Sequence, residues 1–83
     1  MANEYERNVG KREMLKRQRV RQQATVEALR DKLRDLLPVV EDVQTIDGNA
    51  VLDVAASFQM EKADLDNINR QLAVVNRELG ESR

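Results

Sequence analysis

The feature that most constrains this fold is a run of apolar residues between positions 51 and 79. They recur in alternating steps of three and four, the spacing at which side chains return to one face of an α-helix. No glycine or proline interrupts the stretch. We therefore expect a long helix whose apolar seam must be buried against other helices. The seam residues are Val51, Val54, Phe58, Leu65, Ile68, Leu72, Val75 and Leu79, and Glu61 alone breaks the series.

The size of the chain adds a second constraint, because 83 residues form only one small domain. Such domains usually need disulfides, a metal site or oligomerisation for stability. The sequence contains neither cysteine nor histidine, which excludes disulfides and the usual zinc ligand sets. Charged residues make up 35% of the chain, a composition typical of long helices and coiled coils. Oligomerisation is therefore the expected stabiliser.

A first helix is predicted over residues 11–37, which contain no glycine or proline. Pro38 ends it, since proline lacks the amide proton and disfavours helical backbone before it. Residues 1–10 are polar and end in Gly10, which would cost about 1 kcal/mol inside a helix. We expect a flexible N-terminal arm there. The apolar face of this helix consists of Leu15, Val26, Leu29, Leu33 and Leu36, with Arg19 and Gln22 in the seam positions between Leu15 and Val26.

Residues 38–48 are predicted to connect the helices, and the second helix to span 49–79. Thr45 or Asp47 is the expected N-cap. Gly80 suits the position after the C-terminus, so residues 80–83 are expected to fray. The connector is too apolar for a free loop, and we expect four of its residues to fold over the helix ends: Val39, Val40, Val43 and Ile46.

These elements predict an all-α fold, an antiparallel hairpin of two long helices forming one domain over residues 11–79. If Leu36 lies opposite Val51, apolar residues meet near the connector. The predicted hairpin core is Val26, Leu29, Leu33, Leu36, Val51 and Val54.

The other end of the hairpin has mismatched seams. Leu65, Ile68, Val75 and Leu79 would face polar residues, and only Leu15 and Leu72 would meet as apolar partners. A second copy of the chain would cover them, which predicts a homodimer forming a four-helix bundle or coiled coil. A dimer with exchanged helices is the open alternative. The predicted oligomer interface is Phe58, Leu65, Ile68, Leu72, Val75 and Leu79.

A dense basic run lies on the first helix. Residues 1–34 carry ten Lys/Arg and five acids (about +5), whereas residues 35–83 carry four and ten (about −6). The run is a candidate polyanion-binding stripe, or its side chains pair internally with Asp64 and Asp66. Its residues are Lys11, Arg12, Lys16, Arg17, Arg19 and Arg21.

Other positions suggest contacts with a protein partner. Glu61 either sets the register by meeting a basic side chain of another chain or leans into water at the bundle edge, and the second is favoured. Met60 and Val74 are candidate docking residues outside the seam. Similar off-seam apolar residues are Leu52, Met14, Val20 and Leu37, which most simply widen the core stripe toward a second chain.

Catalytic chemistry has little support. There is no His or Cys, and no base is placed to activate Ser57 or Ser82. The acids Glu41, Asp42, Asp47 and Asp53 match no metal-loop spacing, so no metal or cofactor is expected. We expect a non-catalytic, self-associating interaction module, such as a scaffold, adaptor or small regulator that binds a protein partner. The alternative is a dimeric nucleic-acid-binding protein. No membrane span or signal peptide is evident, so a cytoplasmic location is expected.

Overall fold

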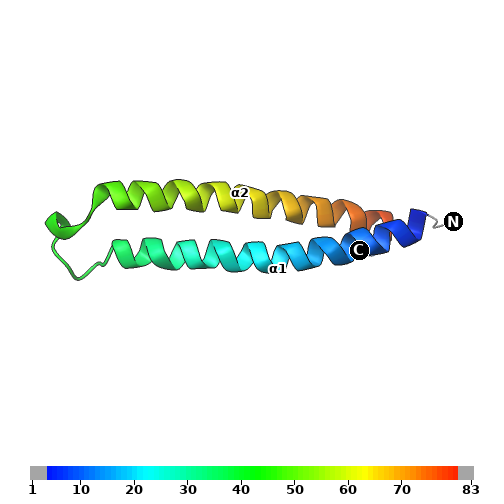
Figure 1. The fold of residues 1–83 in the computed structure, drawn as a ribbon, viewed down its shortest axis with the longest axis horizontal. Helices are drawn as coiled ribbons and strands as arrows, with labels where there is room; N and C mark the ends of the chain where they lie inside the picture. The colour runs from blue at the N-terminus through cyan, green and yellow to red at the C-terminus, as the bar shows by residue number, and fades with distance from the viewer. Residues whose placement is uncertain (1–3, 81–83) are drawn as a thin grey trace.

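The computed structural model describes residues 4–80 and is a hairpin of two antiparallel helices (Figure 1). Its elements are α1 (Glu4–Leu36), a short 3-10 helix η1 (Val43–Thr45) and α2 (Gly48–Glu78). The described residues include no strand. The rod measures 63 × 24 × 14 Å, with the connector at one end and the two chain termini at the other. The predicted all-α hairpin is confirmed.

Helix α1 begins seven residues earlier than predicted, at Glu4 rather than residue 11. Residues 4–10 therefore extend α1 and do not form a flexible arm, while residues 1–3 lie outside the described range. Glu4 and Glu6 in the first turn suit the positive end of the helix dipole. Asn8 and Val9 are half-buried. These contributions outweigh the cost of Gly10, which lies within the helix.

The ends of α2 follow local chemistry closely. Asp47 is the N-cap, and its carboxylate accepts a hydrogen bond from the Ala50 backbone N–H at 3.1 Å. Thr45, the alternative cap, belongs to η1 and its hydroxyl donates to the Asp42 carbonyl oxygen at 2.7 Å. Gly80 has φ +74°, the left-handed conformation expected just beyond the helix. Residues 81–83, predicted to fray, lie outside the described range.

The expectation that the connector folds over the helix ends is wrong for its valines. Val39 is 98% exposed, Val40 91% and Val43 76%, while Ile46 is half-buried. The chain swings away from α2 as it leaves α1 (Figure 1). Asp42 then closes η1 locally, because its carboxylate accepts from the Gln44 N–H at 3.0 Å. The turn is satisfied by its own hydrogen bonds and does not need to pack on the helices.

The best-buried part of the core lies near the termini, not near the connector. Leu15, Leu72 and Val75 form a buried cluster, with exposures of 2%, 3% and 1%, and Ile68 and Leu79 pack against it. The Leu15–Leu72 pairing matches the predicted register. Toward the connector only Val26 and Val54 are buried, and the other predicted core residues are half-buried: Leu29, Leu33, Leu36 and Val51.

Candidate interaction surfaces

The predicted oligomer interface lies inside the single hairpin. Leu65, Leu72 and Val75 are buried within one chain, and the other three members are half-buried: Phe58, Ile68 and Leu79. The expectation that α1 could not cover this half of α2 is therefore wrong. Leu15 packs with Leu72 and Val75 in this half, and the early start of α1 places Tyr5 and Asn8 beside Glu78 and Leu79 around one hollow at the open end.

Glu61, the one charged residue in the seam, has a partner within its own chain. Gln22 donates from Nε2 to the Glu61 carboxylate at 2.5 Å and to its backbone carbonyl oxygen at 2.9 Å. Both residues are half-buried. A second chain is not needed to satisfy this carboxylate, and it does not simply lean into water.

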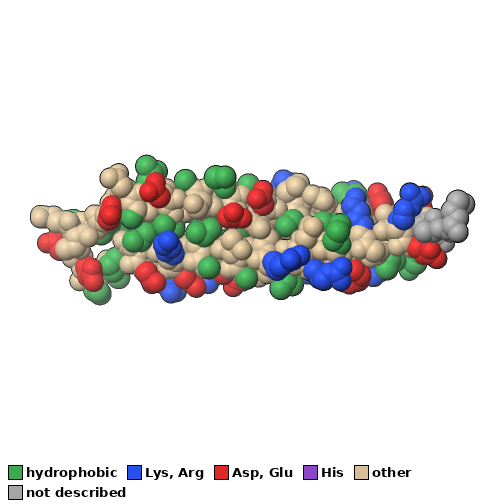
Figure 2. Space-filling view, viewed as in Figure 1, with side chains coloured by type: hydrophobic (Ala, Val, Ile, Leu, Met, Phe, Trp, Pro, Cys, Tyr) green, Lys and Arg blue, Asp and Glu red, His purple; other side chains and the backbone are tan. Residues whose placement is uncertain are grey.

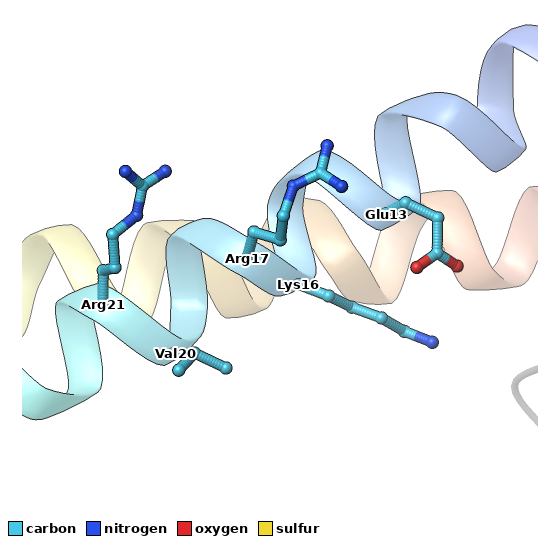
Figure 3. A pocket seen from close by; sticks show the side chains of 5 residues that line it. All are labelled: Glu13, Lys16, Arg17, Val20 and Arg21. Atoms are coloured by element: carbon cyan, nitrogen blue, oxygen red, sulfur yellow. The ribbon is translucent and has the colours of Figure 1, made fainter.

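Three exposed basic residues of α1, Lys16, Arg17 and Arg21, line a shallow surface hollow together with Glu13 and Val20, which is 67% exposed. In Figure 3 Arg17 and Arg21 extend to one side of α1, while Val20 points to the other and Lys16 extends along the helix. All these residues belong to successive turns of α1, so the helix alone fixes their spacing. We call Lys16, Arg17, Val20 and Arg21 the α1 basic patch.

The cations of the predicted polyanion stripe are not neutralised inside the hairpin. Within residues 4–80, no ion pair is formed by Lys11, Lys16, Arg17, Arg19 or Arg21, and all five are exposed. Arg12 differs: its side chain is only 15% exposed and lies 3.5 Å from the Glu13 carboxylate.

Asp64 and Asp66, the predicted internal partners of the stripe, form no ion pair with its cations within residues 4–80. Asp66 binds Lys62 on its own helix at 2.6 Å. Asp64 lines a hollow together with Arg21, but no ion pair joins the two side chains. Within residues 4–80, neither acid therefore forms an ion pair with the exposed cations of the stripe.

Apolar side chains also remain on the outer faces of the helices. Met60 and Val74, the predicted docking residues, are 70% and 48% exposed. The other off-seam apolar residues are exposed in the single hairpin as well, namely Met14, Val20, Leu37 and Leu52. These side chains are scattered over both helices and define no single groove.

The connector forms a second surface that the sequence did not reveal as exposed. Three valines flank two acids over five consecutive residues, Val39, Val40, Glu41, Asp42 and Val43, all of them exposed. We call this segment the valine–acid loop. Figure 2 shows hydrophobic and acidic side chains mixed at this end of the rod, while Lys and Arg gather along α1 nearer the termini. The two acids beside the valines were the signal of exposure in the sequence, because acids are uncommon in a loop that is covered.

Other site types find no support in the described part of the chain. Residues 4–80 contain no cluster of three or more acids placed to hold a metal ion. Neither α1 nor α2, as described, has a segment apolar and long enough to cross a membrane. Comparisons with protein-family models, curated proteins and solved structures give no match.

Proposed function

We propose that this chain is a non-catalytic, self-associating interaction module that presents the outer surfaces of a helical hairpin to a second copy or a protein partner. The observation that carries the proposal is the valine–acid loop. Val39 and Val40 are almost fully exposed although the hairpin has an apolar seam available to bury such residues. Covering an exposed valine is worth about 1.5–3 kcal/mol. A partner that covers the loop gains this free energy.

The net charge supports the self-associating form of the proposal. The whole chain carries −1, so two copies repel each other little. The charge is also unevenly distributed, because the basic residues lie mainly on α1 and the acids mainly on the connector and α2. Such a molecule is complementary to itself in an antiparallel arrangement. A dimer of two hairpins would contain four helices, and its interface would be formed by outer residues, not by the seam.

Sedimentation of the pure chain tests this proposal directly. We expect reversible, concentration-dependent formation of a dimer at low ionic strength, without a change in helix content. A monomer at every concentration would contradict self-association.

Binding of nucleic acid is a second candidate, favoured by the five exposed cations that lack carboxylate partners. Phosphates would bind them with release of counterions, which makes affinity fall steeply with salt. The test is affinity for duplex DNA across a salt series. We expect Lys16→Glu with Arg17→Glu to reduce the salt slope by about two, because each cation that binds a phosphate contributes about one. No affinity for DNA at low salt would rule this function out.

A matched control uses Arg7→Glu with Arg70→Glu. Both residues are exposed, lie outside the basic run and form no ion pair within residues 4–80. The control changes the net charge by the same amount. Equal loss of DNA affinity in both variants would indicate a nonspecific charge effect.

A further inference from the structure

We infer that the valine–acid loop of one copy docks on the α1 basic patch of a second copy, in a reciprocal antiparallel dimer. This inference rests on the proposed self-association and specifies its interface. The two surfaces that meet lie on the same chain, one at the connector and one on the outer side of α1, and they carry opposite charges.

The two surfaces are complementary in both polarity and charge. In the loop, Val39 and Val40 are almost fully exposed beside Glu41 and Asp42. The patch presents Val20, which is 67% exposed, together with Lys16 and Arg17. Apolar contact would cover the valines, while carboxylates lie near cations at the rim. Mixed surfaces of this kind give affinity through apolar burial and orientation through charge.

The charged groups on both sides are free to engage a partner. Lys16, Arg17 and Arg21 form no ion pair within the described residues. Glu41 likewise forms no hydrogen bond or ion pair there. Asp42 uses its carboxylate to accept from Gln44, a bond that leaves acceptor capacity on the other oxygen. Docking therefore breaks none of the hairpin's own contacts.

The geometry of the hairpin allows both contacts to form at once. Val20 lies sixteen residues before the end of α1 at Leu36, or about 24 Å along the helix. After Leu36 the connector dips slightly away from α2, extends past the end of α1 along the long axis of the rod and then turns back to α2 (Figure 1). Two hairpins laid antiparallel, α1 beside α1, bring each loop to the other's patch. Two-fold symmetry makes the two contacts identical.

The segment of α1 between the two contacts allows the α1 helices of two copies to lie side by side. Ala24 and Ala28 are exposed small residues that permit close packing. Asp31 would lie near its symmetry mate, but Arg30 and Arg34 already neutralise it at 3.0 and 3.8 Å. Glu27 and Asp35 are the other acids in this segment, and Arg34 lies 3.7 Å from the Asp35 carboxylate. Like-charge repulsion at Glu27 would be offset at the two loop contacts.

The test is a charge exchange measured by sedimentation. Lys16→Glu with Arg17→Glu places acids on the patch, and Glu41→Lys places a cation on the loop. Each variant alone is expected to weaken dimerisation by about tenfold or more, because like charges then face each other. An equimolar mixture of the two variants is expected to recover a heterodimer. In that heterodimer one contact is unchanged and the other has its charges exchanged.

Controls separate this interface from simpler explanations. Arg7→Glu with Arg70→Glu changes the same net charge elsewhere and should leave dimerisation nearly unchanged. Circular dichroism on every variant checks that the helices persist. Val40→Ser, which alters no charge, should also weaken the dimer because it removes apolar contact.

The outcomes that overturn the inference differ from those that overturn the proposed function. A wild-type chain that is always monomeric contradicts this inference and the self-association in the proposed function. Dimerisation that is unchanged in the patch and loop variants contradicts only this interface. If the patch variant keeps its dimer but loses affinity for duplex DNA, the patch belongs to nucleic acid and the docking inference fails.

Discussion

The side-chain amide of Gln22 joins the two helices through Glu61, with Nε2 lying 2.5 Å from the carboxylate and 2.9 Å from the backbone carbonyl oxygen. The pair lies in the seam between the buried Leu15 cluster and the half-buried leucines nearer the connector. It satisfies a carboxylate that would otherwise be costly on an apolar face. This contact also fixes which turns of α1 and α2 lie opposite each other.

Replacing Gln22 tests how much this pair stabilises the hairpin. Gln22→Ala should lower the free energy of unfolding by about 0.5–1.5 kcal/mol, the net value of a typical hydrogen bond. Changing both residues to leucine should recover this loss or exceed it, because an apolar pair continues the seam. Urea unfolding followed by circular dichroism measures both. A double variant less stable than Gln22→Ala would show that an apolar pair cannot replace the stabilisation that Gln22 and Glu61 provide.

The uneven packing of the seam can be measured with two leucines. Leu72 is 3% exposed, so Leu72→Ala should cost about 2–5 kcal/mol in the free energy of unfolding. Leu33 is half-buried nearer the connector, and Leu33→Ala should cost distinctly less. Unfolding of the two variants under identical conditions gives the comparison. The opposite order would mean that the hairpin is tightest at its closed end.

Gly10 reports whether α1 includes its first two turns. An added Cβ at this position meets nothing within 4 Å. Gly10→Ala should therefore raise the free energy of unfolding by about 0.4–1 kcal/mol, through higher helix propensity and lower entropy of the unfolded chain. Thermal unfolding checks this. An unchanged stability would place residue 10 outside the folded helix.

The N-cap of α2 gives a fourth prediction. Asp47→Ala removes the carboxylate that accepts from the Ala50 N–H and should cost about 0.5–2 kcal/mol of stability. Asp53→Ala serves as the control, since the exposed carboxylate of Asp53 makes no hydrogen bond or ion pair in the described residues. Denaturant unfolding compares the two. Equal losses would point to a general charge effect and not to capping.

Repeat spacing and terminal residues in the sequence determined most of the fold. The three-four spacing of the α2 seam predicted a long helix, Pro38 predicted the end of α1 within one residue, and Gly80 predicted the stop after α2. The match of Leu15 with Leu72 followed from the antiparallel register. These features are local or periodic, so they can be recognised without knowing what packs against them.

Only the tertiary structure decided how far α1 extends and which end of the hairpin is buried. The sequence showed a costly Gly10 and polar first turns, but the benefit of lying along Leu79 depends on where α2 ends in space. The exposure of Val39 and Val40 likewise depends on the direction in which the connector leaves α1. Periodicity identifies an apolar face, but whether that face is covered depends on the length and path of the neighbouring chain.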